Sequence, residues 1–107
     1  MAEAVRLRDI ENDKARRRVA EAMIGEYHEQ QLRLLLERVR EGFEQLDAGM
    51  IDPFELDDLI HRYKRSAQKL WSFCNGSMHS ALTLEWCREH GEPEPDWWKL
   101  GEPRRRP

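Results

Sequence analysis

Apolar residues between residues 13 and 47 recur at intervals of three and four, and no proline interrupts them. This spacing is typical of an amphipathic α-helix, so we predict one long helix over about 13–47. One stripe comprises Leu32, Leu35, Leu36, Val39, Phe43 and Leu46, and a second comprises Ala20, Ile24, Tyr27 and Leu34. We place the second stripe on roughly the opposite side of the helix, with an overlap at the apolar run 34–36.

A helix that is apolar on two sides is normally buried on more than one side. One antiparallel partner helix would cover only one of the two stripes. The pattern therefore predicts that a third element or a second subunit packs against the first helix.

Residues 49–55 are of the types that end one helix and begin the next. Gly49 suits the left-handed position just past a helix C-terminus. Asp52 is suited to cap the next helix, Pro53 to occupy its first position, and Glu55 to complete a capping box with Asp52. We therefore predict a tight corner between two helices.

The second helix is predicted over 53–74. Its apolar stripe consists of Leu56, Leu59, Ile60, Tyr63, Ala67, Leu70, Trp71 and Cys74. Folding this helix back at Gly49 would bring Cys74 close to Gly25. The part of the first helix before Gly25 would then extend past the second helix.

A third, shorter helix is predicted over 78–90, beginning at Ser77 or Ser80 and ending before Gly91. Residues 1–11 are expected to be frayed or loosely helical, with Asn12 or Asp13 capping the first helix. Residues 92–107 contain alternating prolines and are expected to form an extended tail. The division is thus a helical domain over 1–91 and a tail over 92–107.

These elements predict an all-α protein: a long antiparallel helical hairpin, a short third helix and an extended C-terminal tail. Because the first helix carries two apolar stripes, we expect a homodimer in which two hairpins form a four-helix-type bundle.

Composition narrows the class of protein. The 107 residues suit one domain, and the charged content of 36% with a net charge of −3 is typical of a soluble helical protein without a general attraction to nucleic acid or anionic membrane. No run reaches the roughly 18 apolar residues that a membrane span needs. Two cysteines make no disulfide framework, and we expect a cytoplasmic protein with reduced thiols.

Four side chains that can ligate zinc follow one another at Cys74, His79, Cys87 and His90. Their spacing matches no established zinc pattern, because compact zinc sites pair ligands two to four residues apart at both ends. We expect packing cysteines, histidines at helix ends and no cofactor, with a zinc site at these four residues as the alternative.

The sequence contains no nucleophile elbow, phosphate-binding loop or dinucleotide fingerprint, so we expect a non-enzymatic protein. The leading hypothesis is a helical module for protein–protein interaction or regulation. The alternative is a small nucleic-acid-associated protein that would use the basic segments 14–18 and 104–106. A general affinity for nucleic acid is not expected, because acids outnumber bases.

Three of the four tryptophans lie after residue 85, at Trp86, Trp97 and Trp98. The tail is expected to fold back over the helices, because free exposed tryptophans favour aggregation. The other possibility is that the tail binds a partner, since tryptophan anchors many interfaces. The residues expected at an interface are Ala20, Ile24, Tyr27, Leu34, Trp97 and Trp98.

Overall fold

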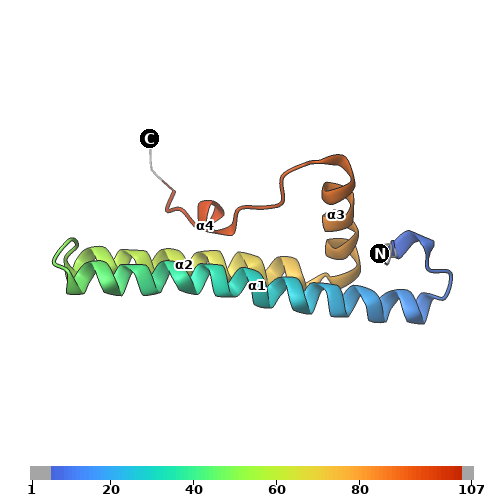
Figure 1. The fold of residues 1–107 in the computed structure, drawn as a ribbon, viewed down its shortest axis with the longest axis horizontal. Coiled ribbons are helices and arrows are strands. Elements are labelled where there is room, and N and C mark those ends of the chain that lie inside the picture. The colour runs from blue at the N-terminus through green and yellow to red at the C-terminus, as the bar shows by residue number, and fades with distance from the viewer. Residues whose placement is uncertain (1–5, 105–107) are drawn as a thin grey trace.

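The structure, a computed structural model, describes residues 6–104, and these residues form helices joined by short segments. Their order is η1 (Leu7–Asp9), α1 (Asp13–Asp47), α2 (Pro53–Asn75), α3 (Ser77–His90) and α4 (Trp97–Leu100). The described residues contain no strand, so the all-α class is confirmed there. The molecule measures 55 × 37 × 25 Å, and the 35-residue α1 spans most of its length (Figure 1).

The antiparallel hairpin of α1 and α2 has the corner that the sequence predicts. The Asn12 side chain caps α1, and Gly49 has a φ of +73°, which glycine adopts without strain. At the start of α2, the Asp52 side chain accepts a hydrogen bond from the Glu55 N–H at 2.8 Å, and the Glu55 side chain reaches back to the Asp52 N–H. Pro53 occupies the first helical position, so this corner is specified locally.

Replacing Asp52 by alanine is expected to lower the free energy of unfolding by about 1 kcal/mol, because the first turn of α2 loses its cap. Urea denaturation followed by circular dichroism measures the change. Asp58→Ala is the matched control, since Asp58 is an exposed acid of the same helix. Equal effects of the two substitutions would show that the capping box does not stabilise this corner.

The N-terminal part of α1 extends past the end of α2, as expected (Figure 1). Gly25 and Cys74 line the same surface hollow, which confirms the predicted register of the hairpin. Helix α3 packs on the extended part of α1 and stands across the hairpin (Figure 1). Its Ala81 and Leu84 are fully buried. Helix α3 is therefore one of the additional elements that the apolar pattern of α1 requires.

The described part of residues 1–11 includes a short helical turn, η1, and is held more firmly than the expected frayed or loosely helical segment. Leu7 is 1% exposed, and its N–H donates a hydrogen bond to the Glu85 carboxylate on α3 at 2.9 Å. The Arg16 guanidinium donates to the carbonyls of Leu7 and Ile10. These long-range contacts hold η1 against α1 and α3.

The tail is not wholly extended, because Trp97–Leu100 forms a helical turn, α4, capped by the Asp96 side chain. Residues 92–96 have no regular structure and carry the chain from α3 back to α2. The tail therefore folds back over the hairpin, as predicted, but it covers the middle of α2 and α1 and not the extended end of α1 (Figure 1).

The two stripes of α1 are not on opposite sides of the helix, which is a correction. Ala20, Ile24, Tyr27 and Leu35 belong to one buried cluster with Leu70 and Trp97 of the same chain. Steps of three and four residues from Ala20 lead through Tyr27 to Leu35 along a single face. A second subunit is therefore not needed to cover this face of α1, because α2, α3, η1 and α4 of the same chain bury it.

Candidate interaction surface

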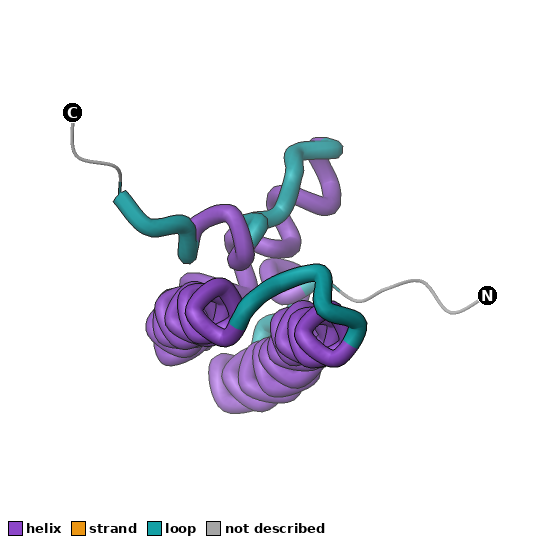
Figure 2. The backbone as a smooth tube through the Cα atoms, turned by 90° about the vertical axis from the view of Figure 1, so that its left-hand side faces the viewer, coloured by secondary structure: helices purple, strands orange, loops and turns teal. Residues whose placement is uncertain are grey.

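One side of the hairpin carries all the smaller elements and the other side carries none. Figures 1 and 2 show α3, α4 and the segment between them on the same side of α1 and α2. No described element covers the opposite side, which we call the open face of the hairpin.

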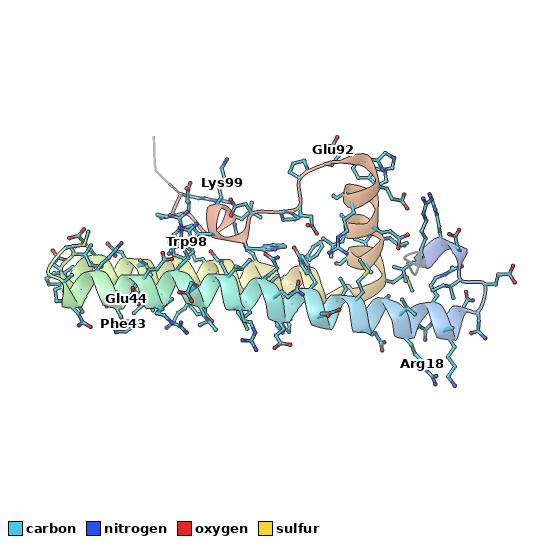
Figure 3. The ribbon with its side chains drawn as sticks, viewed as in Figure 1. Arg18, Phe43, Glu44, Glu92, Trp98 and Lys99 are labelled. Atoms are coloured by element: carbon cyan, nitrogen blue, oxygen red, sulfur yellow. The ribbon has the colours of Figure 1, made fainter. Side chains whose placement is uncertain are left out.

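Three large apolar side chains lie on the open face. Leu36 and Phe43 of α1 are 47% and 49% exposed, and Trp71 of α2 is 58% exposed. Figure 3 shows Phe43 on the side of α1 away from Trp98 and Lys99 of the tail. Leu36 precedes Phe43 by seven residues and therefore shares its side of the helix.

Trp71 belongs to the open face by helix geometry. The side of α2 that holds the tail is marked by Arg62, Arg65 and Lys69, each of which donates a hydrogen bond to a tail carbonyl. Trp71 follows Arg62 by about two and a half turns and so projects to the other side. Met50 and Phe54, at the corner of the hairpin, are exposed as well.

The covered side is held by a short row of cations on α2. Arg62 donates to the Trp98 carbonyl at 3.0 Å, Arg65 to the Gly101 carbonyl at 2.8 Å and Lys69 to the Leu100 carbonyl at 2.7 Å. Cations favour the C-terminal end of a helix, where backbone carbonyls lack partners. The three cations therefore supply hydrogen-bond donors to the free carbonyls at the C-terminal end of α4.

Aromatic packing completes the attachment of the tail. The Trp97 indole N–H donates to the Tyr27 hydroxyl at 2.9 Å, and the Phe73 and Trp97 rings lie 5.2 Å apart. Burial raises the pKa of the Tyr27 hydroxyl, although the hydrogen bond from Trp97 acts in the opposite direction. The Arg62 guanidinium lies over the Trp98 ring at 4.3 Å, an arrangement that favours cation–π attraction.

Most of the residues expected at an interface serve the interior of the single chain. Ala20, Ile24, Tyr27 and Trp97 are buried by its own elements, and Trp98 is partly buried against α2. Leu34 is exposed but lies beside the tail, away from the open face. A contact between subunits therefore cannot use Ala20, Ile24, Tyr27 or Trp97 in this fold.

Sequence reasoning missed the open face, because it assigned Leu36, Phe43 and Trp71 to stripes between the helices. A signal was present at the edges of those stripes. Leu36 and Phe43 are seven residues apart at the side of the α1 stripe away from Ala20, and Trp71 is adjacent to the fully buried Leu70. Edge positions of a wide stripe are the first to remain exposed when only one helix packs against it.

The structure does not gather the four potential zinc ligands into one group. Cys74 and Cys87 are buried free thiols, whereas His79 and His90 are exposed. The His90 ring stacks on Trp86 with centroids 4.5 Å apart. Among residues 6–104, no group of three histidine, cysteine, aspartate or glutamate side chains is placed to hold a metal ion.

The basic segment 14–18 is only partly available to an anionic partner. Arg16 is occupied with backbone carbonyls, while Lys14, Arg17 and Arg18 are exposed, and Figure 3 shows Arg18 pointing away from the body of the molecule. Arg104 is described, and residues 105 and 106 of the other basic segment lie outside the described residues.

Comparison of the chain with protein-family models, with curated proteins and with solved structures gives no match in any of the three. No helix within residues 6–104 combines the length and apolar character needed to cross a membrane. The geometry of the chain is that of a helical hairpin with one covered face, one open face that exposes three large apolar side chains, and a C-terminal tail attached to α2.

Proposed function

We propose that this protein is a non-enzymatic helical module for protein–protein interaction, and that it acts as a homodimer joined through the open face. The observation that carries the proposal is the exposure of Leu36, Phe43 and Trp71 on the side of the hairpin that no described element covers. Large apolar side chains exposed on one face favour association.

A two-fold axis through the open face would bring two hairpins together as a four-helix bundle. In such an isologous contact each apolar side chain meets the same surface of the second copy. Removing these three half-exposed side chains from water would contribute about 1 kcal/mol or more for each. Association also costs translational and rotational freedom, so we expect a dimer that dissociates on dilution.

The state of the two thiols supports a non-enzymatic role. Burial raises the pKa of Cys74, which disfavours the thiolate that a nucleophile needs. Cys74 and Cys87 are both buried and unpaired with each other. Free thiols also suit the proposed cytoplasmic location, where disulfides are rare.

Light scattering coupled to size-exclusion chromatography tests the dimer. The wild type is expected to show twice the chain mass of 12.8 kDa at high protein concentration. The double variant Leu36→Glu, Phe43→Glu is expected to show the single-chain mass, because apposed carboxylates in the contact would repel each other. Both positions are half exposed, so the single chain is expected to remain folded.

Leu82→Glu is the matched control, since Leu82 is a similarly exposed leucine on α3. This variant is expected to remain dimeric. A wild type that stays at the single-chain mass at all concentrations would exclude the dimer. Dissociation by Leu82→Glu, and not by the double variant, would place the contact elsewhere.

A further inference from the structure

The covered side of the molecule contains a groove between α1 and the tail, with a volume of about 640 Å³. Helix α1 forms one wall, and residues 94–98 of the tail form the other. This volume is in the range of clefts that hold a drug-sized ligand or a few residues of a peptide.

Part of the groove lining is apolar. Leu34, Leu35, Trp97 and Trp98 line it, and Leu34 is 63% exposed although Leu35 beside it is buried. Two guanidinium groups help to fix the Trp98 ring, since Arg62 lies 4.3 Å and Arg38 5.5 Å from its centroid. The groove therefore offers a fixed aromatic wall and an uncovered leucine.

The rim of the groove is acidic. Its carboxylates are Glu37 and Glu41 of α1 and Glu94 and Asp96 of the tail, against the single cation Arg38. Glu37 pairs with Arg40 at 3.5 Å and Glu94 with Arg88 at 3.4 Å, but these exposed pairs are weak. Within the described residues Glu41 makes no ion pair or side-chain hydrogen bond, so negative charge is available to a ligand.

We infer that this groove binds a short cationic peptide segment in which lysines or arginines flank a large apolar side chain. The apolar side chain would cover Leu34 against the Trp98 wall, and the flanking cations would face the carboxylates of the rim. Opposite charges across a rim favour encounter and orientation, while buried apolar groups supply affinity. A nucleic acid or an anionic membrane does not fit, because the same carboxylates repel phosphate groups.

This inference rests on the proposed interaction role, but it uses the side of the hairpin opposite the open face. Binding and oligomeric state can therefore be measured on the same samples and fail separately. Loss of peptide binding with an intact dimer removes only the groove inference, and peptide binding by a single-chain protein removes only the dimer.

The probe is a synthetic peptide of paired lysines separated by leucines, titrated into the full chain by calorimetry at low salt. Saturable binding is expected to weaken as salt is added, because the rim charges are exposed to solvent. The double variant Glu37→Gln, Glu41→Gln is expected to bind the peptide about fivefold to tenfold more weakly. Leu34→Gln is expected to weaken binding about tenfold, because the contact with the leucine of the peptide is lost.

Glu21→Gln is the control variant, since Glu21 is an exposed carboxylate of α1 that does not line this groove. It is expected to bind the peptide like the wild type. All substituted side chains are exposed, and thermal unfolding is used to confirm that each variant is folded. No saturable binding by the wild type, or an equal loss with Glu21→Gln, would overturn the inference.

Three further ligands identify what the groove recognises. A peptide with glutamate in place of lysine is expected not to bind, and a peptide with serine in place of leucine is expected to bind at least tenfold more weakly. Spermine supplies positive charge without an apolar side chain and is expected to bind as weakly as the serine peptide. Binding of spermine or the serine peptide as tightly as the leucine peptide would show a site for small cations and would overturn the peptide inference.

Discussion

Replacing Trp97 by alanine is expected to lower the free energy of unfolding by about 3–5 kcal/mol, the usual cost of truncating a buried tryptophan. Trp97 is 6% exposed and contacts both Tyr27 and Phe73. Its removal leaves a cavity in the one cluster that α1, α2 and the tail share. Urea denaturation at a fixed protein concentration measures the change, because the proposed dimer would make stability depend on concentration.

Trp86→Ala is the matched control for Trp97→Ala. Trp86 is 52% exposed and stacks on His90 at the surface of α3. Its truncation is expected to cost about 1 kcal/mol or less, because little buried area is lost. Equal losses for the two variants would show that the tail does not contribute to the core.

Replacing Gly101 by alanine is expected to disturb the attachment of the tail and to cost about 1–3 kcal/mol, the range found for overpacking. A Cβ atom at this position would overlap the Ser66 hydroxyl oxygen and lie 2.9 Å from the Ser66 backbone nitrogen on α2. The tail must move away from α2, which lengthens its bonds to Arg62, Arg65 and Lys69. Protection of the Leu100 and Gly101 amides from hydrogen exchange is expected to fall.

Gly25→Ala is the control for Gly101→Ala. Gly25 lies inside α1, and a Cβ atom there meets nothing within 4 Å. Alanine is expected to stabilise this helix by about 0.5–1 kcal/mol, since glycine is unfavourable in helix interiors. Glycine-to-alanine substitution is thus expected to change the free energy of unfolding in opposite directions at the two positions. A stabilising effect of Gly101→Ala would contradict the close packing of the tail on α2.

Ser66 allows the contact with Gly101 to be tested from the other side. Its hydroxyl is fully buried and has no hydrogen-bond partner among the described residues. Ser66→Ala alone is expected to be neutral or slightly stabilising, because an unsatisfied polar atom is removed. In combination with Gly101→Ala it is expected to recover part of the lost stability, since the shortest of the clashes disappears.

The corner of the hairpin was predictable because its residues act over one helical turn. Gly49, Asp52, Pro53 and Glu55 satisfy local backbone groups whatever else the chain does. The ends of α1, α2 and α3 were predicted to within about a residue for the same reason.

The attachments of the two ends of the chain were not predictable, because they depend on partners far away in the sequence. Leu7 is buried by α3, and its N–H pairs with Glu85, 78 residues away. The turn of α4 forms where α2 offers three cations to its carbonyls. A short segment of this kind carries too weak a periodicity to be recognised alone.

The error at α1 followed from treating two overlapping stripes as two faces. Tyr27 and Leu35 belong to the same buried face, and the wide apolar band of α1 is filled by several elements of one chain. The part of the band that remains open, at Leu36 and Phe43, is narrower than the sequence suggested. Four of the six residues expected at an interface are therefore buried within the single chain, and the proposed dimer depends on different side chains.

The hydrogen bond between Trp97 and Tyr27 joins residues separated by 70 positions. During synthesis on a ribosome, α1 and α2 can pair as soon as both have emerged, because only the corner at residues 48–52 separates the two helices. The aromatic cluster must wait until Trp97 has also left the exit tunnel. Until then the nascent hairpin exposes both of its faces, and in this interval its uncovered apolar side chains favour aggregation.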